Sequence, residues 1–339
     1  MKNKKWISLA AVIVLAVTAL PMTAFAAKKD GEEKLAKVTL NEVAHSIFYA
    51  PQYVAIEEGY FKEEGLDLTL VTGFGADKTM TAVISGEAEI GFMGAEASVY
   101  AYQEGATDPV VNFAQLTQRA GNFLVAREEM SDFKWEDLKG KKVLGGRKGG
   151  MPEMVFEYIL KKNGIDPQKD LTIDQSIDFG STAAAFTGDD SAAYTVEFEP
   201  SATILEKEGA GYVVASLGEA SGYVPYTSYS AKESYMKENP EIIQKFTNAL
   251  QKGMDYVQSH TPEEIAEVIA PQFKETDLDT ITTIVKRYYD QDTWKENLIF
   301  EKDSFELLQD ILEDAGELNT CAEYEKLVQT EYAQKACES

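Results

Sequence analysis

The polarity pattern between residues 37 and 118 alternates short apolar segments with amphipathic ones. Four strand-like segments are expected, at Lys37–Val43, Leu66–Val71, Ala88–Met93 and Val110–Gln118. Helical periodicity lies between them, over Gln52–Glu64, Lys78–Ser85 and Glu96–Glu104. Strands that alternate with helices of this length are typical of right-handed βαβ units on a parallel sheet.

The same rhythm restarts beyond residues 117–122. Further strands are expected at 123–127, 141–144, 171–177, 192–196 and 212–217, with helices at 153–163, 182–186 and 201–208. A polar segment at 218–222 precedes another strand-like run at 226–231, and the chain is helical from Lys232 onward. The pattern therefore predicts an α/β protein of two domains with C-terminal helices. We expect domain 1 at residues 36–117 and 226–318, domain 2 at 118–225, and a tail at 319–339.

The first 26 residues have the pattern of a secretory signal peptide. Three lysines precede the apolar run Trp6–Leu20, which is too short to span a membrane, and Pro21 ends the run. Ala24-Phe25-Ala26 supplies the small-x-small pattern of a cleavage site, and no cysteine follows for lipid attachment. We expect export to the periplasm or the cell surface, with cleavage after Ala26 and no lipid anchor; the alternative interpretation is a retained signal anchor.

The chain is strongly acidic, with a formal net charge of −25 that becomes −28 once the three leader lysines are removed. Such a charge repels nucleic acid and anionic membrane surfaces, so neither is an expected partner. Nothing in the sequence indicates an oligomer, and we expect a monomer. Cys321 and Cys337 both lie in the tail, and the sequence leaves open whether they form a disulfide.

The sequence carries no signature of a catalytic or metal site. It has two histidines, His45 and His260, and lacks the HExxH and GxSxG motifs and any clustered Cys/His spacing. The glycine-rich GGRKGG at 145–150 is neither a P-loop nor a dinucleotide-binding fingerprint. We therefore expect a protein that is not an enzyme and that needs no metal or cofactor.

Glycine-containing loops follow three of the expected strands and each opens a helix, at 73–77, 93–98 and 145–154. Ligands of open α/β sheets bind at the carboxyl ends of the strands. The candidate ligand contacts in these loops are Phe74, Gly75, Ala95, Glu96, Arg147, Gly149, Gly150 and Met151. Glu197 and Glu199 are candidate acceptors for an amino or ring N–H group. Taken alone, each carboxylate also fits a solvated surface charge, and GGRKGG also fits a tight turn.

The stretch AHSIFYAPQYVAIEEGYF, residues 44–61, supplies a further loop of this kind. Its first third follows the first expected strand, and His45, Ser46, Phe48 and Tyr49 are candidate ligand contacts there. Pro51 then begins a helix, where a missing N–H costs little, and Tyr53, Val54 and Ile56 are expected to pack inward.

Several segments, in order and spacing, resemble the SsuA-like solute-binding proteins that serve nitrate, sulfonate, taurine and thiamine-precursor importers. They are YAPQYVAIEEGYFKEEGLDLTLV (49–71), GEAEIGFMG (86–94), WEDLKGKKVLGGRKGG (135–150), FEPSATILE (198–206) and YSAKESYMKENPEIIQKFTNALQKGMDYV (229–257). The resemblance implies a type II periplasmic-binding-protein fold, with two α/β domains joined by two hinge strands and the ligand cleft between them. The hinges would be residues 116–122 and 220–226, which adds Gln118, Arg119 and Tyr223 to the candidate contacts. The resemblance also implies an ABC permease as partner.

The identity of the ligand stays open between two classes. Phe48, Tyr49, Phe74 and Phe179 suit stacking on a planar ring, and the acidic candidates favour an amino-bearing or neutral ligand. These features favour a small heteroaromatic compound such as a thiamine-pyrimidine precursor. The alternative is a sulfonate, taurine or nitrate-type anion held by Arg119 and Arg147.

Two other functions keep the same fold. One is a module that presents its ligand to a membrane sensor. The other is a pyrimidine synthase of the fungal type, which the sequence disfavours because those relatives use a cysteine-rich motif and no cysteine precedes Cys321 here.

Overall fold

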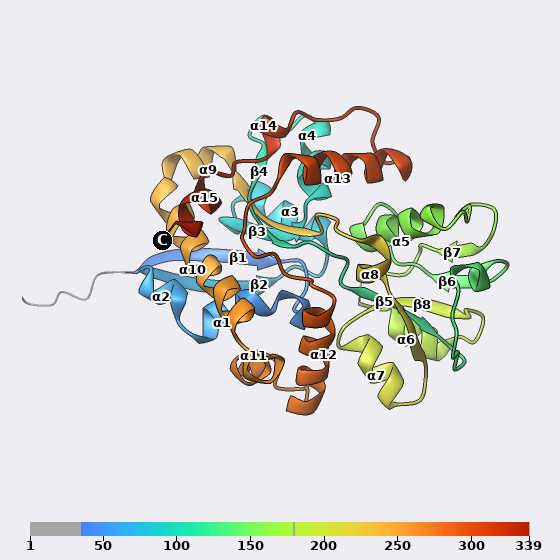
Figure 1. The fold of residues 1–339 in the computed structure, drawn as a ribbon. Coiled ribbons are helices and arrows are strands. Elements are labelled where there is room, and N and C mark those ends of the chain that lie inside the picture. The colour runs from blue at the N-terminus through green and yellow to red at the C-terminus, as the bar shows by residue number, and fades with distance from the viewer. Residues whose placement is uncertain (1–34, 179, 339) are drawn as a thin grey trace, which may run out of the picture. The chain divides into compact units, whose positions relative to one another are not determined.

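Two five-stranded sheets organise the chain in a computed structural model that describes residues 35–178 and 180–338 (Figure 1). The expected signal peptide and Phe179 lie outside the described residues. In the first sheet the strand order is β2-β1-β3-β10-β4. Its strands are β1 (Ala36–Glu42), β2 (Leu66–Thr72), β3 (Ile90–Gly94), β4 (Val110–Thr117) and β10 (Thr227–Lys232).

The second sheet has the order β7-β6-β8-β5-β9. Its strands are β5 (Asn122–Ala126), β6 (Lys142–Leu144), β7 (Thr172–Asp174), β8 (Tyr194–Phe198) and β9 (Tyr212–Ser216). The sheets therefore exchange strands, because the chain leaves the first sheet after β4 and returns to it at β10.

The expectation of parallel sheets is wrong for one strand in each sheet. β1 pairs in parallel with β2 and β3, but β10 runs antiparallel to both β3 and β4. In the second sheet β6 is parallel to β7 and β8, while β5 is antiparallel to β8 and β9. β5 and β10 each arrive from the other sheet, so each enters its new sheet from the edge where the parallel strands end.

Helices surround both sheets, and those expected at 78–85, 96–104, 153–163, 182–186 and 201–208 lie within about two residues of their expected bounds. Up to β10 they are α1 (Ala50–Glu57), α2 (Tyr60–Glu63), α3 (Ala76–Ser85), α4 (Glu96–Gln103), α5 (Met151–Lys162), α6 (Thr182–Gly188), α7 (Ser201–Lys207) and α8 (Leu217–Ser221). After β10 they are α9 (Glu233–Glu238), α10 (Pro240–Ser259), α11 (Pro262–Ile269), α12 (Leu278–Asp290), α13 (Lys302–Asp314), α14 (Tyr324–Leu327) and α15 (Glu331–Cys337). Three short 3₁₀ turns lie at Ile47–Tyr49, Trp135–Leu138 and Ala270–Gln272.

One helix expected as continuous, Gln52–Glu64, is broken in two. Gly59 adopts φ +79 between α1 and α2, a left-handed conformation that ends the first helix. The inward packing of Tyr53 and Val54, both fully buried, and of the partly buried Ile56 is confirmed.

The two chain segments that cross between the sheets are hydrogen-bonded to each other. The Val224 N–H donates to the carbonyl of Gln118, and the Thr117 hydroxyl is joined to Thr227. The segment after α12 also joins them, because the Gln118 N–H donates to the Thr293 carbonyl. These short, paired crossings match the positions expected for hinges, whereas the exact domain boundaries stay a prediction.

The tail packs back on the first sheet. Val328 forms a parallel bridge with Asn112 of β4, and α15 contacts α10. Cys321 and Cys337 are both exposed free thiols, so the disulfide that the sequence left open is not formed in this structure. No helix among residues 35–178 and 180–338 is long and apolar enough to cross a membrane.

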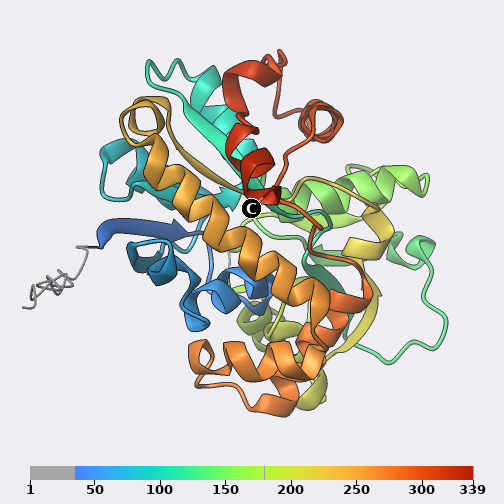
Figure 2. The same cartoon turned by 60° about the vertical axis from the view of Figure 1, so that its left-hand side comes forward.

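Helix α10 crosses α1 at close range (Figure 2). Gly253 of α10 makes this approach possible, since a Cβ there would lie 2.3 Å from the carbonyl oxygen of Pro51 and 3.1 Å from the Cβ of Ala55. The backbone at Pro51 cannot yield without moving the loop that precedes it, which carries Ser46 and Tyr49.

Replacing Gly253 by alanine is therefore expected to destabilise the protein by about 1–3 kcal/mol, because the clash outweighs the helix propensity that alanine gains. Gly188→Ala, in α6 with no atom within 4 Å of the added Cβ, is the matched control and should be neutral or slightly stabilising. Urea unfolding of both variants measures the difference. Equal midpoints would show that α1 and α10 separate at little cost.

Candidate functional site

An aromatic cluster forms where the crossing segments meet the loops at the strand ends. Phe48, fully buried after β1, has its ring centroid 5.1 Å from that of Tyr49 and 5.6 Å from that of Tyr226. Phe198, at the end of β8, lies 5.8 Å from Phe48. The cluster of Phe48, Tyr49, Phe198 and Tyr226 thus joins side chains from both sheets and from one crossing segment.

Glu96 lies beside this cluster at the start of α4. Its side chain is buried, and its Oε2 has no hydrogen-bond partner within the described part of the chain. Burial raises the pKa of this carboxyl to about 7, although nearby N–H groups of Glu96 itself and of Met151, and the charge of Arg147, act in the opposite direction. Burial raises the pKa of Tyr49 and of Tyr226, and the charge of Glu96 adds to the effect on each.

Asn122, the first residue of β5, completes the polar part of the cluster. It is fully buried; its Oδ1 accepts a hydrogen bond from the Tyr226 hydroxyl at 3.4 Å, and its Nδ2 has no partner within the described residues. Sequence reasoning did not name Asn122 as a site residue. Its position directly after a crossing segment, at the start of a strand, is the only signal that the sequence offered.

Two further buried carboxylates belong to the second sheet. Glu197 accepts hydrogen bonds from the hydroxyls of Thr182 at 2.9 Å and Thr195 at 2.6 Å, and burial raises its pKa to about 7. Glu199 accepts from the Thr203 backbone and hydroxyl, both at 2.9 Å, and from Arg287 at 2.8 Å. Glu199 therefore ties α7 to α12, and both of its oxygens are occupied.

The strand-end loops of the two sheets touch directly. The Ser46 hydroxyl donates to the Glu199 carbonyl at 3.1 Å. The Tyr100 hydroxyl donates to the Gly149 carbonyl at 3.1 Å, and Arg147 pairs with Asp77 at 3.2 Å. Gly150 and Met151 begin α5 behind these contacts, with Met151 buried near Glu96. The loops named from the sequence are thus brought together, in a closed arrangement.

His45 lies in a separate network on the first sheet. Its Nδ1 is 2.8 Å from Oε1 of the buried Glu42, and its Nε2 is 3.0 Å from the Gln272 carbonyl. Burial lowers the pKa of His45, but the hydrogen bonds to Glu42 and to Gln272 outweigh that effect and raise it. Glu42 also accepts from Gln52 and Tyr53, so this network fastens α1 to β1.

Three candidates gather at the crossing segments instead of at the aromatic cluster. The Arg119 guanidinium lies 4.3 Å from the ring centroid of Tyr223, and the Tyr223 hydroxyl donates to Asp292. Gln118 donates to the Asp292 carbonyl at 3.2 Å. A role of these residues in ligand contact stays a prediction.

The remaining candidates lie on the loops after β2 and β3. Phe74 is 65 % exposed and has φ +57, and Gly75 follows it at φ +147. Ala95 is buried and directly precedes Glu96. A ligand contact at Phe74, Gly75 or Ala95 stays a prediction.

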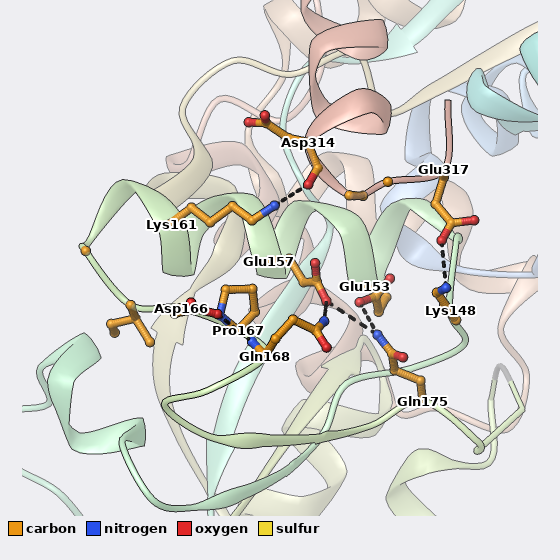
Figure 3. Close-up of a pocket in the computed structure, with 14 residues that line it drawn as sticks. Lys148, Glu153, Glu157, Lys161, Asp166, Pro167, Gln168, Gln175, Asp314 and Glu317 are labelled. Carbon is orange, nitrogen blue, oxygen red and sulfur yellow. Dashed lines mark hydrogen bonds and ion pairs between the residues drawn. The ribbon is translucent and has the colours of Figure 1, made fainter. Parts of the chain in front are cut away.

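The structure also contains a cavity of about 830 Å³ along α5, which sequence reasoning missed (Figure 3). Glu153 and Glu157 lie on its floor, and Gln175 donates to Glu153 at 2.6 Å. Burial, followed by the neighbouring Glu157, raises the pKa of Glu153 to about 8. Lys148 and Glu317, paired at 3.1 Å, lie at the rim. No cluster of three or more metal-binding side chains occurs among the described residues.

Comparison with known proteins decides the family. A profile described as "NMT1/THI5 like" matches residues 47–265, well over half of the chain. The chain belongs to the NMT1/THI5-like family. The chain is 48 % identical over 314 residues, 93 % of each chain, to "Putative binding protein YtlA" of Bacillus subtilis (strain 168). It is also 24 % identical over 225 residues, 62 % of this chain and 63 % of the other, to "4-amino-5-hydroxymethyl-2-methylpyrimidine phosphate synthase THI11" of Saccharomyces cerevisiae.

The fold of this NMT1/THI5-like protein is similar to solved structures of low sequence identity. The alkanesulfonate-binding protein SsuA from Xanthomonas axonopodis pv. citri, bound to MOPS, has a TM-score of 0.70 at 14 % identity, covering 88 % of this chain and 99 % of that one. The expected resemblance and the periplasmic-binding-protein fold are both confirmed.

Replacing Arg287, the positively charged partner of Glu199, tests whether this ion pair holds α7 and α12 together. Arg287→Met leaves a buried carboxylate unpaired and is expected to cost about 3 kcal/mol in unfolding free energy. Lys286→Met, its neighbour with an exposed ion pair to Asp290, is the control and should cost about 0.5 kcal/mol or less. Chemical denaturation measures both. If Arg287→Met lost no more unfolding free energy than Lys286→Met, the stabilising role assigned to the Arg287–Glu199 pair would be contradicted.

The raised pKa of Glu197 predicts a pH-dependent stability. Between about pH 4.5, where this carboxyl ionises in the unfolded chain, and pH 7, the folded state retains a proton that the unfolded state has lost. The contribution of Glu197 to stability therefore falls as pH rises through this window and is constant above it.

Glu197→Gln should remove this contribution to the pH dependence of stability. The melting temperature of wild type minus that of the variant should therefore fall from pH 5 to pH 8. Thermal unfolding across this range measures it, with Glu208→Gln, an exposed glutamate of the same domain, as the control. Parallel pH curves for wild type and Glu197→Gln would rule the effect out.

Proposed function

We propose that this chain is the solute-binding protein of an ABC importer, and that it captures one small ligand between its two sheets by closing about the crossing segments. The observation that carries the proposal is the convergence of the aromatic cluster with Glu96 and Asn122 at the strand ends of both sheets. Ligands of α/β sheets bind at such strand ends, and hinge closure around a ligand is an established class of motion. The names of YtlA, a binding protein, and of SsuA, an alkanesulfonate-binding protein, support the same function.

We further propose a small heteroaromatic ligand such as a thiamine-pyrimidine precursor. Four aromatic rings at one site favour a planar ring as the bound group. The name of the yeast relative, a synthase of a methylpyrimidine phosphate, is consistent with that class. The buried carboxyl of Glu96 disfavours an anion at this site, because two negative charges repel each other strongly where water is excluded.

The arginines give the anion alternative little support. Arg147 is paired with Asp77, and Arg119 lies against Tyr223 and donates to the Gly218 carbonyl. Arg127 donates to carbonyls near Phe186, and Arg287 is paired with Glu199. A sulfonate or nitrate would have to displace one of these partners or bind the buried Nε of Arg119, which has no hydrogen-bond partner among the described residues.

The proposed partners and location follow from the same function. An exported protein, with its signal peptide cleaved after Ala26, would deliver the ligand as a monomer to a membrane permease. Presentation to a membrane sensor keeps the same site and is distinguished by the genes beside this one. The synthase alternative requires chemical change of the bound molecule, which mass spectrometry of the recovered ligand detects.

A melting-temperature screen tests the ligand class. A ligand at 100 times its Kd stabilises the folded state by about 2.7 kcal/mol, so a true ligand gives a clear shift. We expect a shift with 4-amino-5-hydroxymethyl-2-methylpyrimidine and none with taurine, MOPS or nitrate. Tyr49→Ala should reduce the shift, while Tyr289→Ala, exposed on α12, should retain it. A shift with an anion alone would overturn the heteroaromatic class, and no shift with any compound would count against both classes.

A further inference from the structure

Two buried polar atoms at the proposed site have no partner in the described part of the chain. They are Oε2 of Glu96 and Nδ2 of Asn122. A buried polar group without a hydrogen bond costs about 1–3 kcal/mol, so such atoms are rare in stable proteins. The other unpartnered atoms belong to Gln115, Arg119 and Gln244, on β4, on a crossing segment and on α10. Of these five, Asn122 is hydrogen-bonded to an aromatic residue of the cluster, and Glu96 lies over Gly94 at the end of β3.

Both groups lie near the segment that carries Tyr226. Asn122 accepts the Tyr226 hydroxyl through its Oδ1, which leaves its Nδ2 directed elsewhere. The Glu96 carboxyl lies over Gly94 at the end of β3, and Gly94 is paired with Thr227, the residue that follows Tyr226. Glu96 is the first residue of α4, which packs with the first sheet. Asn122 is the first residue of β5, where the chain enters the second sheet. A molecule against the cluster would therefore meet one group from each side.

The two free atoms are chemically complementary to one kind of ligand edge. When ionised, the Glu96 carboxylate only accepts hydrogen bonds, and the amide NH₂ of Asn122 only donates them. We propose that Glu96 and Asn122 select the ligand by binding a polar edge on which a hydrogen-bond donor faces Glu96 and an acceptor faces Asn122. This inference rests on the proposed function and adds its selectivity. An amino group next to a ring nitrogen has this pattern.

The pattern also explains which molecules are rejected. Nitrate or a sulfonate group offers acceptors alone, and an acceptor placed against Glu96 leaves two negative oxygens in contact. A ring with an ether oxygen in place of the amino group lacks the donor and leaves Glu96 unpaired. A site that hydrogen-bonds a ligand group discriminates strongly against the analogue that lacks it.

Two probes that differ only in the donor test the proposal by calorimetric titration. They are 4-amino-5-hydroxymethyl-2-methylpyrimidine and its 4-methoxy counterpart. Wild type should bind the amino probe about 10–100-fold more tightly, the ratio expected for one hydrogen bond to a charged group. This comparison needs no variant, so a folding defect cannot obscure it. Equal affinities of wild type for the two probes would overturn the proposal.

Variants then assign the preference to residues. Glu96→Gln should weaken the amino probe about tenfold or more and reduce the preference, and Asn122→Asp should weaken both probes because it replaces the donor by an acceptor. Glu153→Gln is the matched control, since it makes the same change at a buried carboxyl in the cavity along α5 and should leave both affinities unchanged. The melting temperature of each unliganded variant reports its folding.

The outcomes separate this inference from the function on which it rests. If wild type binds the amino probe and Glu96→Gln and Asn122→Asp bind it equally well, the selectivity proposal is wrong while the heteroaromatic-binding function stands. If wild type binds neither probe but binds taurine or MOPS, the proposed ligand class fails, and the donor–acceptor edge fails with it.

Discussion

Strand β10 hydrogen-bonds to β3 on one side and to β4 on the other, in the middle of a sheet whose remaining strands come from the first part of the chain. β5 does the same in the second sheet, between β8 and β9. Each sheet is therefore incomplete without a strand that has just left the other. This exchange keeps both crossing segments short and pairs them, so the carboxyl ends of the parallel strands in the two sheets face each other. The aromatic cluster, Glu96 and Asn122 all owe their proximity to it.

Buried charge follows two different rules in this protein. Glu42 is surrounded by donors from Gln52, Tyr53 and Thr72, and Glu199 is held by Arg287 and Thr203. Both carboxylates are fully satisfied, and they join helices to strands. Glu96 is equally buried, but its Oε2 has no hydrogen-bond partner among the described residues. Since Glu42 and Glu199 show that this fold can satisfy a buried carboxylate completely, the free Oε2 of Glu96 indicates a position that serves a property other than stability.

Sequence periodicity predicted most of the strands and helices because each strand is a short apolar run bounded by glycine or polar residues. It did not predict the direction of β5 and β10, since antiparallel entry depends on where the chain comes from and not on its local pattern. The rule that ligands bind at strand ends led to Tyr49 and Glu96. The same rule did not identify Asn122, because an asparagine beside a glycine is equally typical of a turn. The engagement of Glu199 by Arg287, far away in sequence, has no local signal at all.

The two unpartnered atoms also bear on why the closed arrangement would need a ligand. Contacts such as Ser46 with the Glu199 carbonyl and Tyr100 with the Gly149 carbonyl are single hydrogen bonds between neutral groups, each worth about 1 kcal/mol net. Leaving Glu96 and Asn122 unsatisfied costs a comparable amount for each. Closure without a ligand would carry these two penalties, whereas water would satisfy both groups if the sheets separated. A ligand with the complementary edge would remove the penalties and add ring packing, so under the proposed function the interactions that select it would also favour closure.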